Sequence, residues 1–423
     1  MNVVIIGNSA AGLSALQNFR KLDKTSRVVM ISKEGLLPYS RVLLPYVLRG
    51  KLPYDGMTIR TQEFFSRMDA QCVEGTVTKL DTAARRVLLE DGRSFAYDKV
   101  LIATGSYAVT PPIEGAHQPG VVHMWTKADV DELLPLFQSG KRAVVIGSGF
   151  VSLQAAWAAC YRGMKVTVIE LMDRIMPSVL DEHGAEVLVK AIGDKGVTLH
   201  TGTSTEKIER QADGSFLVYL KDKAPVAADF VIMGTGVRPN VAFLEGSGVT
   251  VARGIPVDEF MRTNVPDVYA AGDVAAGPTA FGDEHMIHAL WPTAVEMGKT
   301  AAFAMAGQPV AYEGSLNMNV TQMYDVTVAS MGRFNDADID EARCFAPEDG
   351  YGYLKVCYKD GYIVGACLVG ESDAVTLFGK LRPIIRKKQK VDCDIHDLEQ
   401  ITNMRAFARA LSHTALRSKG ERV

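Results

Sequence analysis

The sequence predicts an α/β protein with two doubly wound nucleotide-binding domains followed by a C-terminal α+β domain. A short run rich in Val and Ile leads through a glycine-containing turn into a helical pattern at Asn2, and this arrangement recurs at Lys141. Such runs are typical of parallel strands covered on both faces. From Ala311 the segments become shorter and alternating, and Lys359-Asp360-Gly361 separates two of them. An Asp-Gly turn between alternating runs indicates an antiparallel hairpin.

Length and composition narrow the class of protein. At 423 residues the chain has room for about three domains. A net charge of -3 argues against a nucleic-acid partner. The six cysteines form no CxxC pair or ferredoxin-type run, so we expect reduced thiols and no metal site. We read no export signal at Met1 and find no apolar stretch of about 20 residues, so the expected location is the cytoplasm, with no membrane span.

Two crossovers predict the domain boundaries. The first is the Pro- and Gly-rich segment 107–120, because this composition breaks regular elements. The second follows the apolar run 231–234, after which the chain re-enters the first domain. The expected domains are a discontinuous first domain (1–108 and 230–310), a second domain (109–229) and a C-terminal interface domain (311–423), closed by a helix near 397–418.

The first glycine turn is a candidate dinucleotide site. Small residues connect strand and helix, so that a pyrophosphate can approach the backbone and the helix N-terminus: Gly7, Ser9, Ala10, Ala11 and Gly12. Glu34 follows the next apolar run, about 20 residues on, where a carboxylate can accept both ribose hydroxyls. Ser9 stands in place of the middle glycine of the usual pattern. The alternative is a tight turn that binds nothing.

The second turn predicts a nicotinamide nucleotide. Its candidate residues are Gly147, Gly149, Phe150 and Val151. Glu170 closes the following strand, and an acidic residue there favours NAD over the 2′-phosphate of NADP by repulsion. Arg174 lies close enough in sequence to leave NADP open. An empty relic fold is the alternative.

Three further segments complete a family resemblance. They contribute the candidates Ala103, Thr104 and Gly105, then Gly236, then Gly272 and Asp273. Together with the two turns, this ordered set resembles the two-dinucleotide flavoprotein reductases of the pyridine nucleotide-disulfide oxidoreductase superfamily, and the resemblance covers roughly residues 1 to 310. Within that superfamily it is similar to NADH:rubredoxin and NADH:ferredoxin reductases.

The resemblance implies cofactors and roles. FAD belongs on the first domain and NAD(H) on the second, with Asp273 on the flavin ribityl chain. Trp291 and Ala294 belong to a segment that packs beside the isoalloxazine and opens a helix toward it. Arg41, in Tyr39-Ser40-Arg41, resembles a basic residue that approaches the flavin. Trp291 as an ordinary core aromatic and Arg41 as a surface or phosphate-binding cation are the alternatives.

Two departures from the family pattern narrow the reaction. The segment 36–50 has no cysteine, and Cys72 is too far along to replace the thiols of disulfide reductases. Hydride transfer between nicotinamide and flavin remains, with Arg41, Gln154 and Trp291 as the residues expected beside the reacting rings. Gln154 stands where related reductases commonly carry Glu near the nicotinamide, so it can hydrogen-bond the carboxamide without charge.

The predicted function is an FAD-dependent NADH:acceptor oxidoreductase. Its electron partner would be a small redox protein or iron-sulfur subunits, and it could serve as the NAD-reactive subunit of a complex such as a 2-oxoacid dehydrogenase, as a homo- or hetero-oligomer. The basic segment 380–390 is a candidate docking site, with a solvated helix face as the alternative. The competing hypothesis is a non-catalytic flavin-binding scaffold.

Overall fold

The computed structural model describes residues 1–282, 285–335, 339–346, 352–370 and 375–388. The chain divides into two compact units, which are described separately. The first unit comprises Met1–Leu43, Leu52–Ala108 and Val237–Leu316. The second comprises Leu44–Lys51, Val109–Gly236 and the chain from Asn317 onward.

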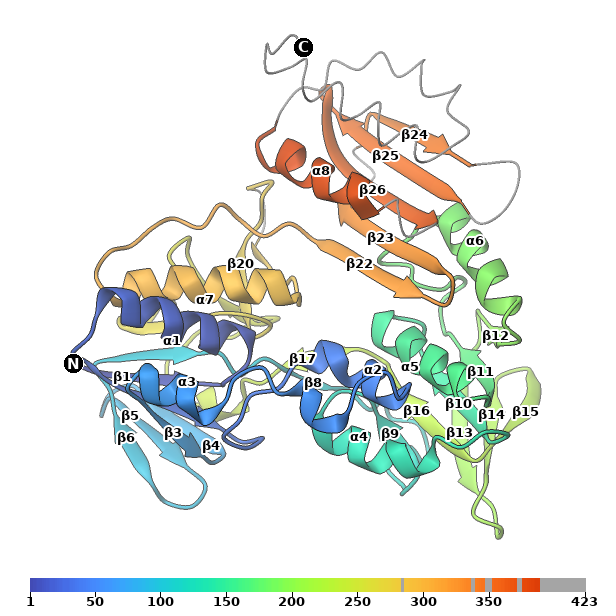
Figure 1. Cartoon of the computed structure of the whole chain (residues 1–423), viewed down its shortest axis with the longest axis horizontal. Helices are drawn as coiled ribbons and strands as arrows, with labels where there is room; N and C mark the ends of the chain where they lie inside the picture. Colours follow the sequence, from blue (N-terminus) through green and yellow to red (C-terminus); the bar gives the residue numbers. More distant parts are fainter. Residues whose placement is uncertain (283–284, 336–338, 347–351, 371–374, 389–423) are drawn as a thin grey trace. The chain divides into compact units, whose positions relative to one another are not determined.

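The first unit is built on a five-stranded parallel sheet in the order β19-β7-β1-β2-β3. Its strands are β1 (Asn2–Ile6), β2 (Arg27–Ser32), β3 (Ala70–Glu74), β7 (Lys99–Ile102) and β19 (Val268–Ala270). Helices α1 (Ala10–Leu22) and α7 (Trp291–Met305) lie side by side against this sheet (Figure 1). Four of these strands, β1, β2, β7 and β19, are the apolar runs of the sequence, and they are almost fully buried. The edge strand β3 is mostly half-buried or exposed.

Smaller elements surround this sheet. An antiparallel sheet joins β4 (Val77–Asp81), β5 (Arg86–Leu89) and β6 (Ser94–Ala96). The crossover strands β8 (Ser106–Ala108) and β17 (Val237–Pro239) pair antiparallel. The remaining elements are α3 (Gln62–Arg67), β18 (Ile255–Pro256), β20 (Ala275–Pro278) and β21 (His285–Met286).

The second unit contains another five-stranded parallel sheet, in the order β12-β11-β10-β16-β9. Its strands are β9 (Val121–His123), β10 (Arg142–Ile146), β11 (Lys165–Ile169), β12 (Thr198–His200) and β16 (Phe230–Met233). Its helices are α2 (Leu44–Leu48), α4 (Lys127–Leu133), α5 (Phe150–Tyr161) and α6 (Glu182–Gly193), and an antiparallel sheet joins β13 (Thr205–Arg210), β14 (Phe216–Leu220) and β15 (Lys223–Ala228).

Two segments group differently from the ranges expected from the sequence. β16 pairs with β10 and β9, so the chain leaves the second sheet after residue 233, whereas we placed residue 230 in the first domain. All four residues of β16 are buried, which suits an inner strand of a parallel sheet. α2 packs on α4 and α5 and so belongs with the second unit.

The C-terminal sheet of the second unit is antiparallel, in the order β22-β23-β26-β25-β24. Its elements are β22 (Met318–Met323), β23 (Val326–Gly332), β24 (Glu341–Phe345), β25 (Tyr353–Lys359), β26 (Tyr362–Gly370) and helix α8 (Val375–Arg386). The expected hairpin turn is present, because Asp360 and Gly361 have φ of 52° and 75° between β25 and β26. The helix expected near 397–418 lies outside the described residues.

The predicted fold class is thus confirmed, with two parallel doubly wound sheets and a C-terminal α+β region. Across the described ranges, every helix is too short or too polar to cross a bilayer.

Candidate functional site

The first glycine turn is fixed by close backbone approach. Gly7 has a φ of 113°, and its N–H donates to the Ile31 carbonyl at 2.8 Å. A β-carbon at Gly7 would lie 2.1 Å from the Ala103 carbonyl oxygen, and one at Gly12 would lie 2.0 Å from the Gly7 oxygen. Both positions therefore require glycine, and the turn brings the end of β7 against the end of β1.

Glu34 lies two residues past β2 and is held by two side chains. The Arg41 Nη2 donates to Glu34 Oε1 at 2.5 Å, and the Tyr39 hydroxyl donates to Oε2. Arg41 Nη1 also lies 3.5 Å from the Ser106 carbonyl oxygen. The sequence placed Arg41 toward the flavin, and the structure brings it together with the carboxylate expected to bind the ribose.

Asp273 lies in a turn after β19, close to the crossover strands. The Ser106 hydroxyl donates to Asp273 Oδ2 at 3.2 Å. Burial raises the pKa of Asp273, while the Ser106 hydrogen bond and the charge of Arg41 lower it. The first unit therefore holds a partly buried carboxyl group in this turn.

Two residues that flank the crossover strands tie them together. The Thr104 hydroxyl donates to the Asn240 carbonyl at 2.9 Å, and Asn240 Nδ2 donates to the Thr104 carbonyl at 3.0 Å. Asn240, four residues after Gly236, was not among the residues predicted from the sequence. Gly105 and Gly236 have φ of 64° and 101°, and a β-carbon at either would meet open space.

Helix α7 begins at Trp291, as the resemblance implied, and packs against α1. Trp291 is partly buried against the core of the first unit, and Ala294 is buried. A β-carbon at Gly272 would lie 3.1 Å from the Ala11 Cβ and 3.5 Å from the Ala294 Cβ. Ala11, Gly272 and Ala294 are thus brought together, and small side chains are needed for this packing.

The second turn repeats the geometry of the first. The Gly147 N–H donates to the Ile169 carbonyl at 2.7 Å, and a β-carbon at Gly147 would lie 2.3 Å from the Gly234 carbonyl oxygen. A β-carbon at Gly149 would meet nothing within 4 Å. Phe150 and Val151 open α5, and Val151 is exposed. The space beside Gly149 is therefore open to a ligand that approaches the backbone.

Glu170 directly follows β11 and is buried. The Ser148 hydroxyl donates to its Oε2 at 2.5 Å, and the Met172 N–H donates to its Oε1 at 2.8 Å. The contact of Ser148 with Glu170 was not predicted from the sequence, because the middle position of a glycine turn accepts many residue types. The sequence offered two signals for this contact. A hydroxyl residue stands between two glycines, and an acidic residue follows the next strand.

The helix N-termini at both turns lack side-chain caps. Ser9 at α1 makes no side-chain capping bond, and Gly149 at α5 has no side chain that could make one. By contrast, Thr126 caps α4 and Asp181 caps α6. Free N–H groups at a helix start favour an anion, so both turns suit the pyrophosphate of a dinucleotide.

Gln154 lies on α5 and is held by strand β22. Its Nε2 donates to Thr321 Oγ1 at 2.7 Å and to the Gln322 carbonyl at 2.8 Å. Since a carbonyl oxygen only accepts, this contact fixes which end of the amide is nitrogen. Gln154 Oε1 is then a buried acceptor that has no partner within the described residues. Such an acceptor fits a ligand amide, which is what the carboxamide of NAD(H) carries.

Replacing Gln154 with Glu should destabilise the second unit in a pH-dependent way. A carboxylate would face the Gln322 carbonyl oxygen with no proton to donate, although the Thr321 hydroxyl can still donate to it. We expect this to lower the free energy of unfolding by about 1–3 kcal/mol at neutral pH. We expect the new carboxyl group to have a raised pKa in the folded protein, because it has no proton to share with the Gln322 oxygen once ionised. The loss of stability is therefore absent below the unfolded pKa of about 4.3 and reaches its full value above the folded pKa. Thermal unfolding across pH tests this. Gln154→Leu should lose stability equally at every pH, and a Glu variant that behaved the same way would contradict the expectation.

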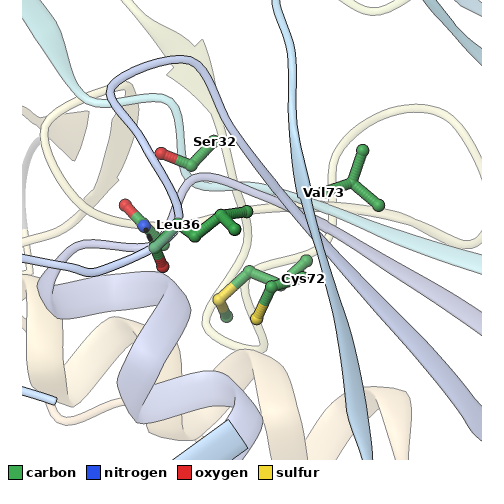
Figure 2. A pocket seen from close by; sticks show the side chains of 6 residues that line it. Ser32, Leu36, Cys72 and Val73 are labelled. Atoms are coloured by element: carbon green, nitrogen blue, oxygen red, sulfur yellow. Dashed lines mark hydrogen bonds between the residues drawn. The ribbon is translucent and has the colours of Figure 1, made fainter. Parts of the chain in front are cut away.

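The structure also bears on thiol chemistry. Figure 2 shows Ser32, Leu36, Cys72 and Val73 around a small hollow in the first unit. Burial raises the pKa of the Cys72 thiol to about 11, so it stays protonated near neutral pH and is a poor nucleophile. No group of metal-ligating side chains occurs within the described ranges.

Comparison with known proteins identifies relatives. The family described as pyridine nucleotide-disulphide oxidoreductase matches residues 1–298. The NADH-dependent phenylglyoxylate dehydrogenase subunit epsilon of Aromatoleum evansii is 31% identical over 87% of this chain and 88% of that protein. The assimilatory nitrate reductase electron transfer subunit of Bacillus subtilis is 30% identical over 88% of this chain and 48% of that protein. The chain thus spans about half the length of this second relative.

One solved structure supports the same grouping. The NAD-dependent persulfide reductase of A. fulgidus superposes with a TM-score of 0.85 at 28% identity, covering 93% of this chain and 78% of that one.

Proposed function

The chain belongs to the pyridine nucleotide-disulphide oxidoreductase family, and from this premise we propose that it passes electrons between NADH and a separate redox protein. Members of the family use FAD and NAD(P)H, so the chain is a flavin- and pyridine-nucleotide-dependent oxidoreductase. The preference for NADH, the partner and the residue roles are our proposal.

The observation that carries the proposal is the presence of two equivalent turns in one chain. Each turn precedes a helix without a side-chain cap, and each is followed by an acidic residue, Glu34 or Glu170, with a hydrogen-bonded carboxylate. Two dinucleotides on one chain suit hydride transfer between them. Because segment 36–50 has no cysteine, no thiol there can take the electrons onward. They would pass instead to or from a second protein.

The cofactors supply the hydride chemistry, and the chain supplies binding and orientation. In our proposal Glu34 accepts the ribose hydroxyls of FAD while Arg41 fixes that carboxylate. Asp273 accepts from the ribityl chain, and Gln154 Oε1 accepts from the nicotinamide carboxamide. The N-terminus of α7 at Trp291 would stabilise negative charge on the reduced flavin.

A role as subunit of a larger enzyme is the finer form of this proposal. The phenylglyoxylate dehydrogenase subunit aligns over nearly its whole length, and its name describes an NADH-dependent enzyme that acts on a 2-oxoacid. We therefore propose that iron-sulfur subunits of such an enzyme are the partner. The basic segment 380–390, described up to Lys388, would be the docking site. Co-purification of iron-sulfur subunits with the chain tests the subunit role, and turnover of the isolated chain with ferredoxin or rubredoxin would favour a free reductase.

Anaerobic titration with NADH should bleach the flavin absorbance of the purified protein within its turnover time. NADPH should bleach it at least about ten-fold more slowly, because Glu170 repels a 2′-phosphate. Absorbance during stopped-flow mixing with either nucleotide measures both rates. Bound FAD that neither nucleotide reduces would contradict direct hydride transfer and favour the scaffold hypothesis.

A further inference from the structure

The buried contact between Ser148 and Glu170 has no counterpart in the first nucleotide turn. Ser148 is 1% exposed and Glu170 is 9% exposed. The Ser148 hydroxyl donates to Glu170 Oε2 at 2.5 Å and accepts from the Met176 N–H at 3.2 Å. One hydroxyl therefore connects the glycine turn, the acidic residue and the loop that follows it.

We propose that Ser148 is a positioning residue that sets the preference for NADH over NADPH by holding Glu170 in place. This inference rests on the proposed binding of NAD(H) at the second turn. An ionised carboxylate has about four acceptor positions. The Ser148 hydroxyl and the Met172 N–H occupy one on each oxygen, which leaves one on each oxygen for the two ribose hydroxyls.

The charge of the groups that hold Glu170 decides whether the site can distinguish NADH from NADPH. Glu34 is held partly by the cation Arg41, whereas the donors to Glu170 are a neutral hydroxyl and a neutral backbone N–H. Among the described residues no cation pairs with Glu170, so its negative charge is not offset. A 2′-phosphate at this place would meet that charge directly.

The hydrogen bonds from Ser148 and Met172 also prevent the Glu170 carboxylate from rotating away. A free glutamate side chain can rotate toward solvent and admit a phosphate, but a buried one with both oxygens held cannot do so without losing hydrogen bonds. Arg174, the nearby cation that could attract a phosphate, has an acidic neighbour, with its Nη1 3.6 Å from Asp173 Oδ1. The specificity of the site therefore depends on Ser148 as well as on Glu170.

The test is Ser148→Ala, with dissociation constants for NADH, NADPH and ADP-ribose measured by equilibrium titration of the FAD-loaded protein. We expect the constants for NADH and ADP-ribose to rise together by about ten-fold, because both carry the adenosine ribose. The constant for NADPH should stay within about two-fold or fall, so that the NADH preference falls by about ten-fold. Ser148→Thr, which keeps the hydroxyl, should restore most of the preference.

Ser152→Ala is the matched control. Ser152 is also 1% exposed, lies on the helix α5 that follows the Ser148 turn and donates to the Gly234 carbonyl at 2.9 Å, but it makes no contact with Glu170. Its loss should lower thermal stability without changing the ratio of NADH to NADPH affinity. Equal weakening of both nucleotides by Ser148→Ala, or no change, would overturn the inference while leaving the proposed function standing. A wild-type protein that binds neither nucleotide would overturn both.

Discussion

Replacing Gly298 with alanine is expected to lower the free energy of unfolding by about 3 kcal/mol and to reduce the FAD content of the purified protein. Gly298 lies on α7, where a β-carbon would be 2.2 Å from the backbone oxygen of Ala11 on α1. Because the nearest Ala11 atoms are backbone and a β-carbon is fixed by its own backbone, no rotamer change relieves this contact, and the helices must separate. Ala11 belongs to the first glycine turn, so the displacement would reach the proposed pyrophosphate site.

Thermal unfolding and the ratio of flavin to protein absorbance measure the two effects. Gly193→Ala on α6 is the control, since a β-carbon there would meet nothing within 4 Å. That variant should be neutral or slightly more stable, as expected for alanine in a helix. A Gly298 variant with unchanged stability and full FAD content would show that α1 and α7 do not need this close approach.

Gly298 illustrates what the sequence could not predict. Gly7, Gly12 and Gly147 were predicted because strand, turn and helix are continuous in sequence, so the need for small residues is local. Gly298 packs against Ala11 from helix α7, which comes much later in the sequence of the first unit. The residues next to Gly298 in sequence do not indicate that contact. The two parallel sheets were predictable for the same local reason, since apolar strands and glycine turns alternate along the chain.

The acidic residues of the candidate site could be predicted from the sequence. The side chains that hydrogen-bond them were harder to predict. Glu34 and Glu170 follow from their place after the strand that comes next after each glycine turn. What holds each carboxylate did not follow, because Arg41 and Ser148 reach them only after the chain turns back. Gln154 was expected at the nicotinamide, but its bonds to Thr321 and Gln322 depend on a sheet formed far downstream.

Replacing Asp273 with Asn is expected to weaken FAD binding by about ten-fold while making the FAD-free protein more stable at neutral pH. Burial raises the pKa of Asp273 above its ordinary value of 3.8. The ionised group therefore destabilises the fold: the destabilisation is absent below 3.8, grows as pH rises through the folded pKa and is constant above it. Asparagine removes that penalty, but it also removes the charge that strengthens a bond from a ribityl hydroxyl.

Asp229→Asn supplies a control of opposite sign. A hydrogen bond from Arg142 Nη2, 2.9 Å from Asp229 Oδ1, lowers the pKa of this second carboxyl group. Its ionised form therefore stabilises the fold above its ordinary pKa, and the stabilisation is lost as pH falls through the lowered one. At neutral pH the Asp273 variant should melt above the FAD-free wild type and the Asp229 variant below it, with both differences vanishing in acid. The opposite outcome is that the FAD-free Asp273 variant melts below the FAD-free wild type at neutral pH. That result would show that the wild-type carboxylate stabilises the fold, and it would contradict the proposal that Asp273 is retained to accept a hydrogen bond from FAD.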